Sequence, residues 1–480
     1  MNFWKDLHMN VFLSLLVAIV LSGQETKASK PNILFFFADD QRADTINALG
    51  NKTIITPNID QLVKEGTAFE RAYIMGGSQG AVCVPSRAMM LSGKSLFRIS
   101  EQLKGTVTWP MALRDAGYET FATGKWHNGQ PSLAASFSNA KSIYLGGMSA
   151  QFNTPVSDVG TEGKMINQKT PNDHCSEIFA NEAIEFLKKT PKEKPFAAYI
   201  AFKSPHDPRQ APKKFLDMYN PKEIPLPANY LPEHSFNNGE LLIRDERLEK
   251  WPRSKNAVQQ HLAEYYAIIT HEDEQIGRII KTLKETGRFE NTIIIFSADN
   301  GLAIGSHGLM GKQSVYEHSV KIPLVIAGPG IQKNKRSQAM CYTFDLFPTF
   351  CEAAGAKIPA GMEGKSLWPV LKGTNATHRN EIFSAYRGLM RGLNDGRYKL
   401  IVNIGVNKTQ LFDLQNDPDE MQDLAGNEIH KDRVAAMTAK LKTVQGEWSD
   451  KQELKSEKPL PLKIDLSKVP EEKSKGKKKG

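Results

Sequence analysis

The chain has 480 residues, of which 40% are hydrophobic and 24% charged, and its formal net charge is +9 at pH 7. This length exceeds a comfortable single core and predicts one large domain with a smaller one. The composition excludes a collagen-like or wholly disordered chain. Part of the positive charge lies in residues 468–480, which hold six lysines and two glutamates. The remaining mildly basic body suits a polyanionic substrate. No nucleic-acid-binding motif is present, so no nucleic-acid partner is expected.

The amino terminus predicts an export signal. Lys5 precedes an apolar run over residues 11–21, and small or polar residues follow at 22–24. This pattern is typical of a secretory signal peptide, which we place at residues 1–23. Because the run is too short for an ordinary membrane-spanning helix, we expect an exported protein, periplasmic or secreted, with no stable membrane insertion. A retained membrane anchor is the alternative.

Strands and helices alternate along the first 330 residues. Residues 32–38 form a continuous apolar run that ends in charge, which is typical of a strand buried on both faces. The glycine- and serine-rich stretch at 128–170 has weak periodicity and is expected to be a long loop. The alternation predicts an α/β domain over residues 30–370, with a large, mostly parallel central sheet flanked by helices. Further strands are predicted at 118–122, 196–202, 292–297 and 322–327, and helices at 57–66, 109–116, 175–189 and 258–286.

After residue 371 the pattern becomes that of a small antiparallel α+β domain, which we place at residues 371–450. Residues 390–403 read as a hairpin around the turn Asn394-Asp395-Gly396. A short strand at 410–414 and a helix at 431–448 follow. The Lys-rich residues 451–480 are expected to be a disordered tail.

The chain has four cysteines, which is few for an exported protein, so disulfides are not expected to hold the fold together. Cys83 is set aside because it belongs to a motif described below. Cys175, Cys341 and Cys351 cannot all pair within one chain, so at least one of them is expected to be a free, buried thiol. Which of them pair stays open.

Chemically active side chains follow four of the predicted strands. In an open α/β sheet, ligands bind where loops leave the carboxyl ends of the strands. Asp39 and Asp40 follow the first predicted strand, and Asp299 and Asn300 follow the fourth. Three carboxylates and an amide oxygen are ligands that Ca²⁺ or Mg²⁺ prefers, and the shortage of His and Cys disfavours zinc. We expect one divalent ion, Ca²⁺ in preference to Mg²⁺, with helix or turn capping by each Asp as the alternative.

The remaining two strand ends carry basic and imidazole side chains. Lys125 and His127 stand in the sequence Gly-Lys-Trp-His after the second predicted strand, and His206 follows the third. Four separate strand ends that each carry reactive side chains are difficult to explain by chance.

The pentapeptide Cys83-Val84-Pro85-Ser86-Arg87 matches the pattern C-x-P-S-R. With the strand-end motifs, it makes the chain resemble the sulfatase family of the alkaline-phosphatase-like superfamily, from residue 32 to about 424. In that family the cysteine is oxidised to Cα-formylglycine, so the resemblance implies a formylglycine-generating or sulfatase-maturing enzyme as a partner during biogenesis. The resemblance assigns Asp39, Asp40, Asp299 and Asn300 as metal ligands, Cys83 as the formylglycine, Arg87 as the arginine that steadies it, and Lys125, His127, His206 and Lys312 as catalytic or substrate-binding groups.

The function implied by the resemblance is hydrolysis of the sulfate ester of a sulfated carbohydrate. A hydrated aldehyde offers two hydroxyls, so one can attack the sulfur and the other can expel the product, whereas a thiol would be trapped as a stable adduct. The metal, Lys125 and Lys312 would neutralise the sulfate oxygens. Asp299 would take the proton of the attacking hydroxyl, and His206 would protonate the departing oxygen. His127 would then deprotonate the second hydroxyl and release inorganic sulfate.

Several alternatives stay open. His307 precedes Lys312 in a glycine-containing loop and is a further candidate substrate contact. A phosphate or phosphonate monoester hydrolase of the same superfamily is a second reading, although no extra Asp/His cluster for a second metal is visible. A catalytically silent glycan-binding relative is a third, although it would have no use for His127 and His206 together. The sugar, the sulfate position, endo or exo action and the oligomeric state are not determined. Lys203, Arg98, Trp109, Arg209 and Arg253 are expected at the surface, the last four being possible glycan contacts.

Overall fold

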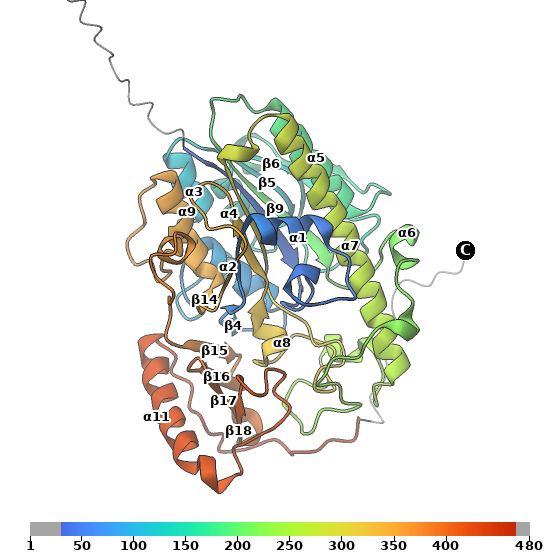
Figure 1. The fold of residues 1–480 in the computed structure, drawn as a ribbon, viewed down its shortest axis with the longest axis vertical. Helices are drawn as coiled ribbons and strands as arrows, with labels where there is room; N and C mark the ends of the chain where they lie inside the picture. The colour runs from blue at the N-terminus through green and yellow to red at the C-terminus, as the bar shows by residue number, and fades with distance from the viewer. Residues whose placement is uncertain (1–29, 467–480) are drawn as a thin grey trace, which may run out of the picture.

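The computed structural model describes residues 30–466, so the predicted signal peptide at 1–23 lies outside its described part. The main element is a ten-stranded sheet in the order β13-β2-β12-β10-β1-β9-β5-β6-β7-β8 (Figure 1). Its five central strands, from β10 to β6, are all parallel. The strands β12 and β7 join each end of this block in the antiparallel direction. The predicted large and mostly parallel sheet is confirmed.

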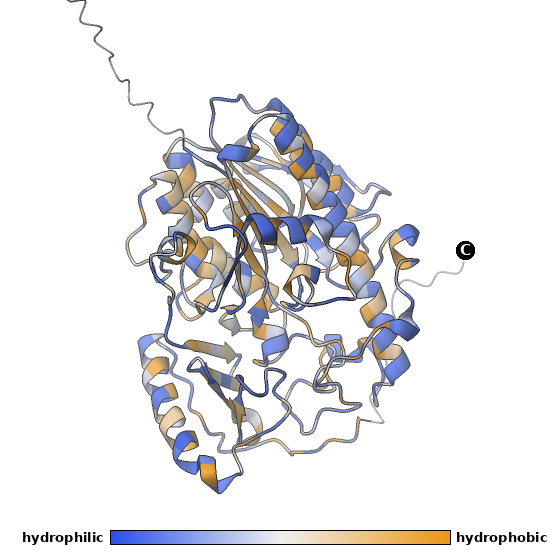
Figure 2. Cartoon of the chain, in the orientation of Figure 1, coloured by the Kyte–Doolittle hydropathy of each residue, from blue (hydrophilic) through white to orange (hydrophobic). Residues whose placement is uncertain are grey.

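The central strands are buried on both faces, as their continuous apolar sequences predict. Every residue of β1 is buried, and the aromatic side chains of Phe35, Phe36 and Phe37 are fully enclosed. Figure 2 shows hydrophobic residues along these strands and hydrophilic ones on the outer sides of the helices. The strands of the sheet are β1 Asn32–Asp39, β2 Gly66–Phe69, β5 Glu119–Lys125, β6 Asn139–Tyr144, β7 Val156–Val159, β8 Met165–Lys169, β9 Phe196–Pro205, β10 Thr292–Ala298, β12 Leu324–Ala327 and β13 Lys335–Ser337.

Helices cover both faces of the sheet (Figure 1). On one face the 31-residue helix α7 (Lys255–Glu285) packs on α5 (Cys175–Lys189), β9 and α1 (Pro57–Glu65). On the other face Trp109 packs edge-on against Phe350, with ring centroids 5.0 Å apart, and links two helices beneath β1. The helices of this second face are α2 Cys83–Ser92, α3 Trp109–Asp115, α4 Gln130–Ser136 and α9 Leu346–Ala354, and the short helices elsewhere are α6 Lys213–Leu216, α8 Glu317–Val320 and α10 Trp368–Leu371.

A smaller antiparallel sheet with one covering helix forms the carboxyl-terminal part (Figure 1). The predicted hairpin turn joins β16 (Met390–Asn394) to β17 (Tyr398–Asn403), and α11 (Lys431–Glu447) packs on this sheet. The sheet also contains a strand from the first hundred residues, because β4 (Gly76–Gly77) pairs with β15 (Ile382–Tyr386). The strand β4 thus links the large domain to the small sheet, and it lies six to seven residues before Cys83 in the chain. The other short strands are β18 Lys408–Asp413, β3 Ala72–Tyr73, β11 Lys321–Ile322 and β14 Cys341–Tyr342.

Three expectations about the fold are corrected. The region 128–170, predicted to be a loop, contains α4, β6, β7 and β8. The prediction failed because elements of four to seven residues leave little periodicity in the sequence. The predicted strand at 322–327 is divided between β11 and β12, which lie in different sheets. The predicted disordered tail is wrong for residues 451–466. There, Leu460 N donates to Gly405 O, Asn237 N donates to Leu462 O, and Leu466 is buried.

All four cysteines are free and buried, so no disulfide contributes to the fold. Within residues 30–466 no helix combines the length and apolar character needed to cross a membrane.

Candidate active site

The order of the sheet determines which strand ends meet. β1 lies between β10 and β9, and β5 lies on the other side of β9. Because these four strands are parallel, their carboxyl ends share one edge. That edge carries Asp39, Asp299 and Lys125, together with His206, which directly follows β9. The structure therefore brings together side chains that the sequence places up to 260 residues apart.

Asp39, the last residue of β1, is surrounded by cationic groups. Its Oδ2 accepts a hydrogen bond from Lys125 Nζ at 2.5 Å, and its Oδ1 lies 3.8 Å from Arg87 Nη2. All three side chains are completely buried. Burial alone would raise the pKa of Asp39, but the charges of Lys125, His206 and Arg87 hold it well below its usual range. Asp39 is therefore a permanent anion at the centre of the edge.

Asp40 holds the second lysine. Its backbone has a φ of 70°, which turns its side chain out of the strand. Its Oδ1 accepts hydrogen bonds from Lys312 Nζ at 2.5 Å and from Asn300 Nδ2 at 2.8 Å. His206 Nε2 lies 3.6 Å from the other carboxylate oxygen. Lys312 comes from the loop that precedes α8, so Asp40 joins this loop to β1.

Asp299 is fixed by helix α2. Its Oδ2 accepts a hydrogen bond from Arg87 Nε at 2.9 Å, and its backbone carbonyl accepts one from Ser86 Oγ at 2.5 Å. Its Oδ1 accepts from the backbone N–H of Asp40 at 3.0 Å. Burial and the neighbouring Asp39 raise the pKa of Asp299 to about 7. Residues 86 and 87 of the pentapeptide thus position one carboxylate of the cluster.

Cys83 is the first residue of α2 and faces this cluster. Its Sγ lies 3.3 Å from His127 Nδ1 and 3.8 Å from Lys125 Nζ. Burial raises the pKa of the thiol to about 11, so an unmodified Cys83 is protonated and weakly nucleophilic at neutral pH. The positive end of the dipole of this ten-residue helix favours an anion beside Cys83.

The two histidines differ in their surroundings. Burial and the charge of Lys125 lower the pKa of His127 to about 2, so its imidazole is neutral at neutral pH. His206 Nδ1 lies 2.7 Å from the carbonyl oxygen of Asp207, an acceptor, so this nitrogen carries hydrogen. His206 Nε2 is then the atom that faces the cluster, 3.6 Å from Asp40 Oδ2.

The oxygen-rich edge fits a hard divalent cation. Within the described residues, the buried atoms Asp39 Oδ1 and Asn300 Oδ1 accept no hydrogen bond, which is costly for buried oxygens. A bound cation would satisfy both. Ligand atoms of Asp39, Cys83 and Asp299 lie within 4.8 Å of one another, and so do those of Asp39, Asp40 and His206. Carboxylate and amide oxygens are the ligands that Ca²⁺ and Mg²⁺ accept.

His307 lies apart from this cluster. Its ring stacks on Tyr316 with centroids 4.3 Å apart, and its Nε2 lies 3.2 Å from Asn229 Nδ2. Its carbonyl oxygen accepts from His234 Nδ1. The ring is therefore used in packing beneath its loop, and no contact with the cluster is seen in the described part of the chain.

Other residues also differ from their expected positions. Lys203 is fully buried, and its Nζ donates to the carbonyl oxygens of Ser149 and Ala150, which lie in a loop passing over the site. Trp109, Arg209 and Arg253 are buried as well. Arg253 is held by nearby Glu246 and Trp251, whereas Lys203 and Trp109 contact segments distant in sequence. The sequence did not predict that the loop around Gly147 reaches the site. A Cβ atom added to Gly147 would lie 2.7 Å from His127 Nε2.

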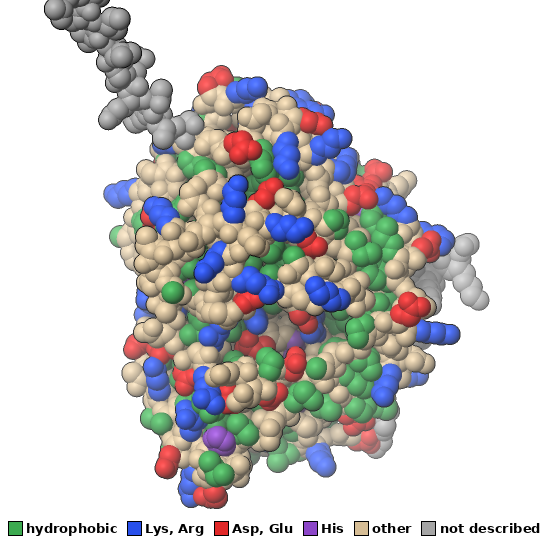
Figure 3. Space-filling view, in the orientation of Figure 1, with side chains coloured by type: hydrophobic (Ala, Val, Ile, Leu, Met, Phe, Trp, Pro, Cys, Tyr) green, Lys and Arg blue, Asp and Glu red, His purple; other side chains and the backbone are tan. Residues whose placement is uncertain are grey.

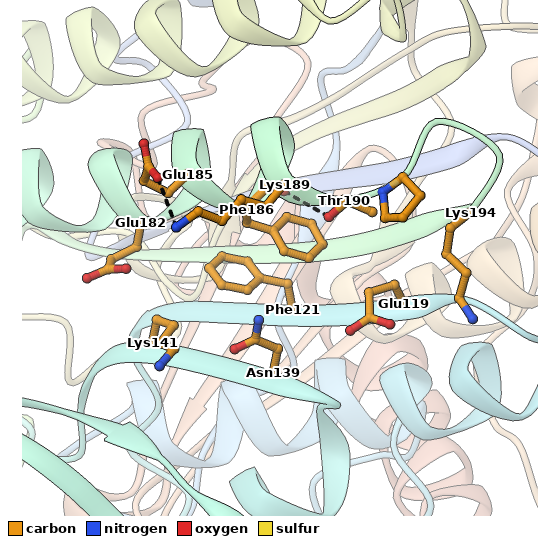
Figure 4. Close-up of a pocket in the computed structure, with 11 residues that line it drawn as sticks. Glu119, Phe121, Asn139, Lys141, Glu182, Glu185, Phe186, Lys189, Thr190 and Lys194 are labelled. Atoms are coloured by element: carbon orange, nitrogen blue, oxygen red, sulfur yellow. Dashed lines mark hydrogen bonds and ion pairs between the residues drawn. The ribbon is translucent and has the colours of Figure 1, made fainter.

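Two large hollows lie elsewhere. A cavity of about 480 Å³ is lined by Glu119 at the start of β5, the end opposite Lys125, and by Phe121, Phe186 and Lys189 (Figure 4). A second, of about 580 Å³, is lined by Arg42 and residues of α8, which faces the viewer in Figure 1. Figure 3 shows basic and acidic side chains interspersed over that face. Some charged side chains that line them are paired within the protein, among them Lys189 with Glu185 in the first and Arg42 with Asp44 in the second.

Comparison with known proteins gives the site a family context. A family model described as Sulfatase matches residues 31–356, and one described as N-sulphoglucosamine sulphohydrolase, C-terminal, matches residues 305–447. The chain is 30% identical to an arylsulfatase of Clostridium perfringens over 458 residues, covering 84% of this chain and 92% of the relative. It is 27% identical to an N-acetylglucosamine-6-O-sulfatase of Bacteroides thetaiotaomicron, covering 91% and 90%.

Solved structures share the fold. One, in complex with its substrate D-glucosamine-2-N,6-O-disulfate, has a TM-score of 0.76 and 25% identity, covering 89% of this chain and 100% of that chain. A phosphonate monoester hydrolase of Agrobacterium radiobacter has a TM-score of 0.69 and 21% identity, covering 90% and 100%. The second likeness concerns the fold alone.

Proposed function

Because the chain belongs to the sulfatase family, and is a sulfuric ester hydrolase, we propose that it releases inorganic sulfate from a sulfated carbohydrate by means of a formylglycine made from Cys83. The observation that carries the proposal is the position of Cys83. Its Sγ lies within 3.8 Å of both His127 and Lys125, at the edge where three buried carboxylates meet. A hydrated formylglycine supplies a hydroxyl nucleophile there, which the buried thiol does not.

We propose Ca²⁺ as the cofactor. Asp39, Asp40, Asp299 and Asn300 would hold it. When bound, the cation would neutralise charge on the sulfate group and favour a deprotonated hydroxyl on residue 83.

Lys125 and Lys312 bind the sulfate oxygens in this proposal. Both ammonium groups are buried, one held by Asp39 and the other by Asp40. In a buried site, fixed cations stabilise developing negative charge more strongly than solvent does. Arg87 acts indirectly, because it holds Asp299 and lies next to Asp39.

The two histidines move protons at separate atoms. His206 donates from Nε2 to the departing sugar oxygen, while its Nδ1–H is held by the carbonyl of Asp207. His127 accepts a proton at Nδ1, the atom that faces residue 83. Acid and base are thus provided by different strands, because His127 follows β5 and His206 follows β9.

A carbohydrate substrate is supported by the N-acetylglucosamine-6-O-sulfatase named above, which aligns along nearly the whole chain. The alternative function, phosphonate monoester hydrolysis, is suggested by a solved structure that is 21% identical, and this likeness concerns the fold alone. A silent glycan-binding protein would not need the buried lysines and both histidines. Neither alternative is favoured.

The test combines chemistry and activity. Mass spectrometry of the peptide containing residue 83 should show the loss of the thiol in favour of an aldehyde when the chain is made together with a sulfatase-maturing enzyme. Turnover of an aryl sulfate should exceed turnover of the matching aryl phosphate, and Cys83→Ala should abolish it while leaving the thermal unfolding midpoint in place. An unmodified thiol in fully active protein would refute the proposal.

We also propose export, on the sequence of residues 1–23. Amino-terminal sequencing of protein recovered from the periplasm or medium should begin near residue 24. Recovery of the intact amino terminus only from the cytoplasm would contradict this.

A further inference from the structure

A chain of hydrogen bonds and ion pairs crosses the site from the neighbour of His206 to the neighbour of Lys312. Asp207 accepts from Arg244 Nη1 at 2.6 Å and Nη2 at 3.0 Å. Arg244 Nε donates to Asp245 Oδ1 at 2.8 Å. Asp245 Oδ2 accepts from Gln313 Nε2 at 2.7 Å. We call the residues Asp207, Arg244, Asp245 and Gln313 the rim arch.

The rim arch borders the space above residue 83. Gln313 Nε2 also donates to the carbonyl of Gly80, three residues before Cys83. Arg244 Nη1 contacts the sulfur of Met148, whose neighbour Gly147 lies against His127. The arch therefore lies next to the candidate acid, base and sulfate-binding lysine together.

The arch is held rigidly. Next to Asp245, the carboxylate of Glu246 accepts from the backbone N–H groups of Met310 and Gly311 at 2.9 and 2.8 Å. Arg253 Nη2 donates to the same carboxylate at 2.9 Å. Because these contacts tie the arch to the loop that bears Lys312, its charges stay in place when a ligand enters.

The net formal charge of the arch is negative, although Arg244 is more exposed than either carboxylate. Asp207 and Asp245 carry two negative charges against one positive charge on Arg244. Arg244 Nε and both Nη atoms already contact carboxylates or the sulfur of Met148. The guanidinium therefore has no free N–H pair for a substrate anion, whereas carboxylates retain lone pairs that accept from hydroxyl groups.

We propose that the rim arch selects a sugar that carries a single sulfate and is otherwise uncharged near the reacting group, and excludes one with a second anionic group there. The proposal rests on the proposed function, whose site it completes. A second sulfate or carboxylate beside Asp207 and Asp245 would meet like charge at close range in a partly buried site. Sugar hydroxyls would instead donate to these carboxylates. The net charge of +9 draws polyanions toward the whole molecule, but the arch discriminates locally.

The first experiment compares two aryl sulfates of similar shape and different charge, 3-carbamoylphenyl sulfate and 3-carboxyphenyl sulfate, with their kcat/KM values corrected for the acidity of the two leaving phenols. We expect kcat/KM to be at least about tenfold higher for the neutral carbamoyl compound, since like charges near a protein surface repel strongly. Raising the ionic strength should narrow the ratio because salt screens exposed charges. N-acetylglucosamine 6-sulfate and D-glucosamine-2-N,6-O-disulfate, each used as substrate and as inhibitor, should follow the same order.

Variants identify the charge responsible. Asp245→Asn should reduce the ratio of kcat/KM for the carbamoyl compound to kcat/KM for the carboxy compound at least about threefold. The double variant Asp245→Asn with Gln313→Glu returns a carboxylate to the arch and should restore the ratio. Asp413→Asn removes a carboxylate paired with Arg397 in the small sheet, far from the arch, and should keep the ratio of the unaltered protein.

The outcomes separate the two proposals. Absence of turnover of every sulfate ester by protein with formylglycine at residue 83 would overturn the proposed function, and the inference with it. Efficient turnover with equal or better use of the carboxylated compound would overturn the inference alone. So would a ratio that is insensitive to both salt and Asp245→Asn.

Discussion

His127 Nδ1 lies 3.3 Å from Cys83 Sγ, although 44 positions separate the two residues along the chain. The contact exists because β5 ends beside the first turn of α2, and His127 turns back with a φ of 67°. The imidazole is buried and neutral, so residue 83 faces a base and not a cation on this side.

Replacing this base should slow turnover and leave binding largely intact. We expect His127→Gln to lower kcat by about 10²–10⁴-fold, the usual contribution of a general base, with a small change in KM. His261→Gln, on the partly exposed side of α7, is the matched control and should retain activity. Formylglycine content must be measured for both proteins. Equal kcat values at equal formylglycine content would contradict the role of His127.

Removal of divalent cations should reduce both activity and stability. Chelation should abolish sulfate release, Ca²⁺ should restore it, and added Ca²⁺ should raise the unfolding midpoint because the ion binds only the folded protein. Asn300→Ala removes one proposed ligand and the hydrogen bond to Asp40, so a higher Ca²⁺ concentration should be needed for both effects. If the chelator changed neither the activity nor the unfolding midpoint, the proposal of a bound metal ion would be contradicted.

Gly124 is required by the packing of β5 on β9. Its φ is +100°, and an added Cβ would lie 1.9 Å from the carbonyl oxygen of Ala201. We expect Gly124→Ala to lower the free energy of unfolding by more than about 2 kcal/mol and to displace Lys125. Gly117→Ala is the matched control, because Gly117 has a similar φ of +93° and open space around it. It should cost only about 1 kcal/mol.

Urea unfolding of both glycine variants measures the difference. A similar loss for Gly124→Ala and Gly117→Ala would mean that β5 can move away from Ala201 at little cost.

Acid should destabilise the protein partly through His271. Its side chain is fully buried on α7, and burial, with the charges of Lys214 and Arg278, lowers its pKa to about 3. An unfolded histidine titrates near pH 6.5, so the unfolded state binds more protons between these values. The stabilisation is present above pH 6.5 and is lost as the pH falls toward 3.

His271→Gln should therefore flatten the pH dependence of stability. Between pH 7 and pH 4 the variant should lose up to roughly 3 kcal/mol less free energy of unfolding than the unaltered protein. Denaturant titrations at several pH values provide the measurement, with the partly exposed His430→Gln as control. Parallel curves for the unaltered protein and His271→Gln would show that this residue does not contribute.

Much of the fold was predictable because its signals are local. The all-apolar run of β1 and the helical spacing of α7 are properties of neighbouring residues, and both elements lie where their patterns place them. The region 128–170 was not predictable in this way. Its strands β7 and β8 have four and five residues, too few for a period to emerge, and they are stabilised by pairing with one another and with β6.

The residues of the candidate site likewise fall into two groups, those that a local sequence pattern predicts and those whose position depends on tertiary packing. Asp39 and Lys125 end their strands and Asp299 directly follows its own, so a local pattern marks them. His307 follows an equally suggestive loop, yet its ring stacks on Tyr316, because the direction of a side chain depends on what packs around it. Lys203 and Trp109 lie inside the protein for the same reason.

The amino-acid sequence alone determined the chemical groups of this protein and the strands that carry them, since both are written in short stretches of residues. Only the tertiary structure decided that β1 lies between β10 and β9, which brings the N–H of Asp40 to 3.0 Å from Asp299 across 259 positions. It also decided that Arg244 and Asp245 together bridge the neighbours of His206 and Lys312. Such contacts depend on the order of strands and on side-chain packing between distant segments, and no pattern of adjacent residues encodes them.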